Sequence, residues 1–103
     1  MLKLDLVPES FEVEVDGGKF TFKYDSRVPL KIGFATSVED RLIILKETLI
    51  KIDNIKTGDG EAKLEDFFRL PPAYLAKVFL AYTDKIAEMN TVEAEGKNEE
   101  KSS

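Results

Sequence analysis

SVEDRLIILKETLIKID, residues 37–53, is the stretch around which we expect the rest of the chain to be arranged. Thr36 and Glu39 have the spacing of a capping box, in which side chains satisfy the unpaired amide groups at a helix start. Apolar residues then recur at steps of four and three: Val38, Leu42, Leu45, Leu49 and Ile52. Because such steps line one face of a helix, the pattern predicts a single helix over the whole stretch.

Three isoleucines of this stretch lie outside that apolar stripe: Ile43, Ile44 and Ile50. A helix that rests on one small core needs only a single stripe. The surplus is covered either by the rest of the chain or by another subunit, and we favour another subunit. The sequence therefore predicts a homo-oligomer in which these isoleucines contact a protein partner.

Two alternating segments on either side of Asp16-Gly17-Gly18 predict a β-hairpin. Its apolar face is expected to consist of six residues: Phe11, Val13, Val15, Phe20, Phe22 and Tyr24. The alternate residues are expected to face water: Glu12, Glu14, Thr21 and Lys23. A two-stranded hairpin is only marginally stable alone, so we expect its aromatic face to rest on a helix.

Two further helices are predicted in the second half of the chain. A short one covers residues 64–69 and ends before Pro71-Pro72, and a long one covers residues 73–89. Two other segments allow more than one interpretation. Residues 30–35 fit either a strand or a short helix after Pro29, and the alternating residues 2–6, which end before Pro8, fit either an edge strand or an arm on another subunit.

These elements predict an α+β fold, with the N-terminal β-hairpin packed on a small antiparallel helical body. Residues 1–90 are expected to form a single domain, since a chain of 103 residues is too short for two. Residues 91–103, TVEAEGKNEEKSS, contain few apolar side chains. That composition cannot offset the entropy lost on ordering, so the sequence predicts a disordered, flexible acidic tail.

Composition argues against several functional classes. The chain has no cysteine and no histidine, which removes thiolate metal ligands, the commonest imidazole ligand and the usual general base near neutral pH. A formal net charge of −5 disfavours binding to nucleic acid. No segment has the pattern of a membrane span or a signal peptide. We therefore expect a cytoplasmic protein that is not an enzyme, with no cofactor and no nucleic-acid or membrane partner.

A glycine-containing loop before residues 64–69 resembles the second half of an EF-hand calcium loop, with Gly60 at the tight turn and Asp66 near the last ligand position. In that register Ile55 occupies the first ligand position, where a carboxylate is needed. The other register brings Asp53 to the first position and Leu64 to the last. The sequence therefore favours a solvated loop, and a degenerate calcium-binding module remains as an alternative.

Phe67 and Phe68 are adjacent on the predicted short helix. Aromatic residues at this density are most simply explained as core, but two neighbouring side chains on a helix cannot point the same way. We expect one of them to be exposed, and we count both as candidate partner-binding residues with the three isoleucines.

The layout as a whole resembles the tail assembly chaperones of long-tailed bacteriophages. The resemblance rests on FEVEVDGGKFTFKY at residues 11–24, on the helices at 37–53 and 73–89, and on the acidic end at 91–103. It implies a chaperone that binds the tape-measure protein, recruits tail-tube subunits and self-associates. We therefore expect a non-enzymatic protein-binding assembly factor. A small oligomeric structural adaptor without a viral role is the other alternative.

Overall fold

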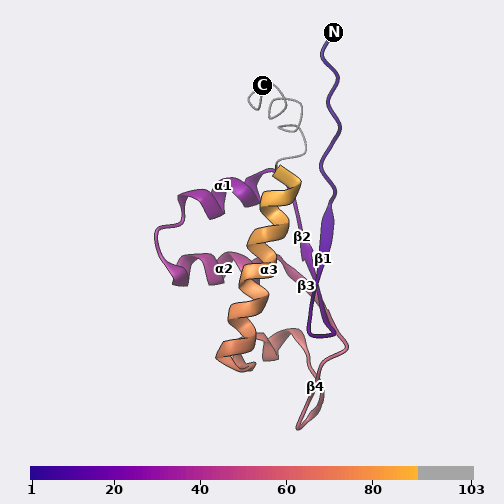
Figure 1. Ribbon diagram of the computed structural model, residues 1–103, viewed down its shortest axis with the longest axis vertical. Helices are drawn as coiled ribbons and strands as arrows, with labels where there is room; N and C mark the ends of the chain where they lie inside the picture. Colours follow the sequence, from indigo (N-terminus) through magenta and orange to yellow (C-terminus); the bar gives the residue numbers. More distant parts are fainter. Residues whose placement is uncertain (91–103) are drawn as a thin grey trace, which may run out of the picture.

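The structure, a computed structural model, describes residues 1–90. It contains three α-helices, one 3-10 helix and two small antiparallel sheets within those residues (Figure 1). In chain order the elements are β1 (Ser10–Val15), β2 (Gly18–Lys23), α1 (Arg27–Phe34), α2 (Val38–Thr48), β3 (Leu49–Asp53), β4 (Lys56–Thr57), β5 (Gly60–Glu61), η1 (Leu64–Arg69) and α3 (Pro72–Asn90). The predicted α+β class is confirmed, whereas the predicted tail at 91–103 lies outside the described residues.

The N-terminal β-hairpin forms as predicted. β1 and β2 pair in an antiparallel register that places Phe11 opposite Phe22 and Val13 opposite Phe20. Asp16 and Gly17 both have positive φ angles, +51° and +90°, as a tight turn between right-twisted strands requires. All six residues of the predicted apolar face are buried. The strict alternation of apolar and polar residues therefore identifies both the strands and their buried face.

The predicted helix over residues 37–53 is wrong in its second half. α2 ends at Thr48, and the last five residues form β3, which pairs with β2. In this pairing Ile52 lies opposite Phe20 and Leu49 opposite Phe22, with a register shift between them that leaves Ile50 unmatched. Ile50-Lys51-Ile52-Asp53 alternates as a strand does, and Leu49 is brought to the core side by the register shift. The unpaired edge of β2 provides the hydrogen-bonding partner that selects the strand.

Local hydrogen bonds mark both ends of α2. Ser37, not Thr36, is the N-cap, and its hydroxyl accepts a hydrogen bond from Asp40 N–H at 3.1 Å. At the other end, the Thr48 hydroxyl lies 2.9 Å from Ile44 O and 3.2 Å from the Tyr82 hydroxyl. The end of α2 is thereby tied to α3 at the point where the chain becomes extended.

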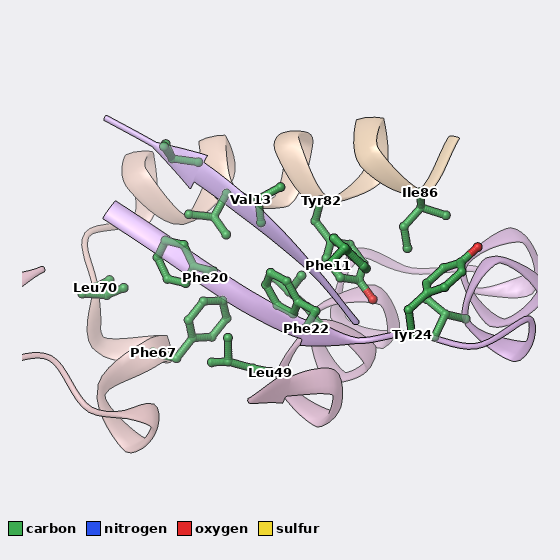
Figure 2. Packing of buried hydrophobic residues seen from close by; sticks show 14 residues of the cluster. Phe11, Val13, Phe20, Phe22, Tyr24, Leu49, Phe67, Leu70, Tyr82 and Ile86 are labelled. Carbon is green, nitrogen blue, oxygen red and sulfur yellow. The ribbon is translucent and has the colours of Figure 1, made fainter. Parts of the chain in front are cut away.

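The core lies between the sheet and the helices. Figure 2 shows Tyr82 and Ile86 of α3 reaching toward Phe11, Phe22 and Tyr24 of the hairpin. The rings of Phe22 and Tyr82 are 4.7 Å apart in an edge-to-face arrangement. Among residues 1–89, every buried residue other than Gly18 is hydrophobic. The aromatic face of the hairpin therefore rests on a helix, as expected.

The sequence allowed two interpretations each for residues 30–35 and residues 2–6, and the structure shows a helix in the first segment and an extended arm in the second. Residues 27–34 form helix α1, which runs beside α2 in the opposite direction (Figure 1). Residues 1–9 are extended and exposed, and they project from the start of β1.

The predicted polar loop before η1 contains the short β4–β5 hairpin. It follows a strand rather than a helix, so the helix–loop–helix setting of an EF-hand is absent there.

Gly18 is expected to be the glycine least tolerant of a side chain. A Cβ atom at this position would meet the Tyr74 hydroxyl and would lie 2.7 Å from Ile55 Cγ1. The Tyr74 hydroxyl also donates a hydrogen bond to Val15 O at 2.7 Å, so it is not free to move away. Gly18→Ala is therefore expected to destabilise the fold by about 1–3 kcal/mol, measured as a lower midpoint of urea denaturation.

Gly33→Ala is the matched control for this substitution. Nothing lies within 4 Å of a Cβ atom at Gly33, which is in the exposed part of α1. Removing a helical glycine there is expected to stabilise the protein by about 0.5–1 kcal/mol. Equal effects of the two substitutions would show that the contact between Gly18 and Tyr74 is not tight.

Candidate protein-binding surface

The described residues offer no cluster suited to metal binding. No group of three or more His, Cys, Asp or Glu within residues 1–90 is close enough to hold an ion, and no charged side chain in this range is buried. No helix in the described part of the chain has both the length and the apolar character needed to cross a bilayer. The surface features that remain to be explained are exposed apolar side chains.

The pKa shifts within this part of the chain have structural causes. Hydrogen bonds from Arg27 lower the pKa of Asp25, whose Oδ1 accepts from Arg27 N–H at 2.8 Å. This exposed pair fixes the turn from β2 into α1. Burial raises the pKa of Tyr82, whose hydroxyl reaches Thr48. These groups hold elements of the fold together.

The structure separates the five candidate partner-binding residues into two groups. Ile43, Ile50 and Phe68 are between 42% and 48% exposed and are available for contact. Ile44 is only 9% exposed and Phe67 is fully buried, so neither is available for contact and their choice as partner-binding residues is wrong.

Packing explains both buried positions. Ile44 lies on the inner side of α2, where it lines a shallow hollow with Tyr24, Val28 and Thr48. The ring of Phe67 packs against Phe20, with 5.8 Å between the ring centroids, while Phe68 points outward. The prediction that one of the two adjacent aromatics is exposed is therefore confirmed.

The most exposed large apolar residues of the body were not among the candidates. We call Leu30, Phe34 and Val38 the helical tip. Phe34 is the last residue of α1 and Val38 the first of α2, on either side of the turn at the left of Figure 1, and Leu30 lies one helical turn before Phe34. Phe34 is 82% exposed, Val38 65% and Leu30 60%. A phenylalanine exposed to this extent loses most of the free energy that its burial would provide. The helical tip is therefore the main apolar surface of the folded body.

A signal for the helical tip is present in the sequence of α1. Val28 and Ile32, four residues apart, face the core, and Leu30 and Phe34, also four residues apart, face outward. A short helix with apolar pairs on both sides has one pair more than a single core requires. The signal was missed because residues 30–35 also alternate like a strand.

The N-terminal arm, residues 1–8, is a second exposed apolar segment. Leu2, Leu4 and Leu6 are between 66% and 96% exposed, and the arm extends away from β1 in Figure 1. The arm is thus available for contact with another chain. Such contact is what the interpretation of residues 2–6 as an arm on another subunit requires.

Comparisons with protein-family models, with curated proteins and with solved structures found no match to this chain. The functional proposal therefore rests on the surface of this chain: the helical tip, the N-terminal arm and the exposed residues Ile43, Ile50 and Phe68.

Proposed function

We propose that this protein is a non-enzymatic assembly factor that holds an apolar segment of a partner protein. The observation that carries the proposal is the helical tip, with Phe34 82% exposed beside Leu30 and Val38. Large apolar side chains that are exposed to this extent and lie close together in the sequence favour a protein interface.

The helices that present the helical tip are each attached to the core. Val28 of α1 and Leu45 of α2 are buried there. A surface that is held in its binding conformation loses little conformational entropy when a partner binds. This favours binding by the helical tip over a purely structural role for α1 and α2.

The expected occupant is the apolar face of a partner helix. Leu30 and Phe34 are spaced to meet residues at i and i+3 or i+4 of such a helix. The net charge of −5 favours partners that carry basic residues beside the apolar ones. On the resemblance to tail assembly chaperones, the partner is a tape-measure protein, tail-tube subunits are recruited, and the setting is the host cytoplasm.

The calcium-binding alternative gains no support from the geometry. Ile55 stands at the first ligand position of the better register, and its carbonyl accepts a hydrogen bond from Ala62 N–H at 2.9 Å. The residues between them form the β4–β5 hairpin. A calcium loop needs its oxygen atoms turned inward around the ion, and a paired hairpin does not provide that arrangement.

Co-expression with a tape-measure protein, the proposed partner, followed by pull-down, tests the proposal. Wild type is expected to retain the tape-measure protein. The double substitution Leu30→Ser and Phe34→Ser is expected to weaken binding by more than about tenfold, since each buried apolar side chain contributes about 1.5–3 kcal/mol. Both side chains are largely exposed in the free protein, so the fold should be retained.

Leu80→Ser is the matched control. Leu80 lies on α3 and is 60% exposed, the same fraction as Leu30. Binding that is lost equally in this control, or kept in the double variant, would count against the helical tip. Wild type that retains no tail protein would overturn the viral assignment and favour an adaptor with a different client.

A further inference from the structure

We propose that the N-terminal arm of one copy of this chain adds a strand to the outer edge of β3 in a second copy. The outer edge is the side of β3 that faces away from β2. The proposal concerns self-association, and it stands whether or not the helical tip binds a partner.

The N-terminal arm has the alternating sequence of a β-strand but belongs to neither sheet of the described chain. Leu2, Leu4 and Leu6 alternate with Lys3 and Asp5, and all five side chains are exposed. Pro8 has no amide hydrogen to donate, so the arm is separated from β1 where the sheet begins. An alternating segment of this length can satisfy its backbone groups and cover its apolar side by joining the edge of a sheet.

β3 offers the edge that such a segment needs. The sheet order is β1-β2-β3, and no strand within residues 1–90 pairs with the outer edge of β3. Exposed edge strands present unpaired N–H and C=O groups and act as templates for a further chain. Ile50 is 42% exposed and Ile52 is half-buried, so this edge also has uncovered apolar surface.

The side-chain directions on β3 restrict the register. Ile52 lies opposite Phe20 and therefore faces the core side, whereas Lys51 and Asp53 lie opposite Thr21 and Lys19 on the other side. An antiparallel arm with Leu4 opposite Ile52 would turn its leucines toward the core side. A shift by one residue would turn them all to solvent.

Charge selects among the registers that remain. With Leu4 opposite Ile52, Lys3 lies opposite Asp53 and Asp5 lies opposite Lys51. A shift by two residues in one direction places Lys3 opposite Lys51, and a shift in the other direction places Asp5 opposite Asp53. Opposite charges stabilise cross-strand pairs and like charges destabilise them, so one register satisfies both the apolar and the charged residues.

The exposed edge of β1 is a poorer acceptor for the arm. β1 has the sequence SFEVEV and contains no lysine or arginine. Asp5 therefore has no cationic partner there in any register, whereas at β3 both charges of the arm are matched. The comparison favours β3.

The arm cannot reach this position within its own chain. Glu9 is held beside β2, because its carbonyl accepts a hydrogen bond from Tyr24 N–H at 2.8 Å. The position beyond β3 is three strand spacings from β1, about 14 Å. In the proposed register Leu6 is the arm residue nearest to Glu9 that must lie beside β3. The three residues from Glu9 to Leu6 span at most about 11 Å, which is shorter than that distance. A second copy must therefore supply the arm.

Cysteine cross-linking in the full chain tests the register directly, because the natural sequence contains no cysteine. Leu4→Cys combined with Ile52→Cys places two thiols opposite each other, within the range a disulfide needs. Oxidation is expected to produce cross-linked dimers or higher species on a non-reducing gel. Leu2→Cys with Ile52→Cys is the control, and its thiols are too far apart for efficient cross-linking.

Charge reversal provides a second test by light scattering coupled to size exclusion. Asp5→Lys places two lysines opposite each other and is expected to weaken self-association about fivefold. Adding Lys51→Asp makes the cross-strand charges opposite again but removes the Lys51–Asp53 ion pair, so it is expected to restore association in part. A wild-type chain that stays monomeric at high micromolar concentration, a disulfide formed within one chain, or failure of the double reversal to restore association would each overturn the proposal.

Discussion

Phe67→Ser is expected to abolish cooperative folding near physiological temperature. The ring of Phe67 is fully buried and packs edge-to-face against Phe20. Its removal costs about 3–5 kcal/mol, and the new hydroxyl, without a polar partner in an apolar core, adds about 1–3 kcal/mol. Their sum approaches the whole stability of a small domain, about 5–15 kcal/mol. Thermal unfolding followed by circular dichroism measures the loss.

Phe68→Ser is the control on the neighbouring residue. Phe68 is 48% exposed, so its replacement is expected to cost about 1 kcal/mol and to shift the melting temperature by only a few degrees. Similar melting temperatures for the two variants would contradict the assignment of Phe67 to the core. Of the two aromatics, Phe68 is thus the one whose substitution can report on binding.

Phe22→Ala is expected to remove about 3–5 kcal/mol from the free energy of unfolding. Phe22 is fully buried and stacks 5.6 Å from Phe11, in addition to its contact with Tyr82. Alanine would leave a cavity between the hairpin and α3, and the stiff aromatic neighbours cannot collapse into it. Urea denaturation should show a much lower midpoint with an unchanged slope.

Lys23→Ala is the control for the hairpin. Lys23 is the next residue on β2 and points to the exposed side of the sheet. Its replacement is expected to change stability by no more than about 0.5 kcal/mol. A loss of comparable size in both variants would show that the stability of the sheet does not depend on its aromatic face.

The hairpin was predictable because its signals are local. Alternation in residues 11–15 and 20–24 specifies which side of each strand is buried, and Asp16-Gly17 supplies the positive φ angles of the turn. No long-range contact has to be known for either inference. The buried position of all six predicted residues follows from this local pattern.

The end of α2 was not predictable in the same way. Leu49 and Ile52 fit the apolar stripe of a helix, whereas residues three apart would face opposite sides of a regular strand. Both face the core side of β3 because the register shifts between Thr21 and Phe22. The choice depends on β2, which is some thirty residues away in the sequence and has an open edge. A pattern confined to residues 37–53 contains no information about that edge.

Only some of the candidate binding residues were predicted correctly, because their exposure also depends on contacts with other parts of the chain. The buried side of α2 differs from the predicted stripe, because Ile44 and Leu45 are buried whereas Val38 is 65% exposed. Ile44 therefore faces the hollow beside Tyr24, and only Ile43 of this adjacent pair faces solvent. Phe34 was missed because the type of element at residues 30–35 was open. The side of an element that a residue occupies is known only after the element itself is known.

Site-specific photo-cross-linking from position 34 tests the central claim, that the helical tip holds a partner protein, most directly. A photoreactive phenylalanine analogue in place of Phe34 retains the exposed aromatic character of the site, and the same analogue at Leu80 serves as the control. In cells that co-express a tape-measure protein, the partner proposed above, we expect a covalent adduct with that protein from position 34 and little or none from position 80. Equal adducts from both positions, or no adduct from position 34, would contradict the account.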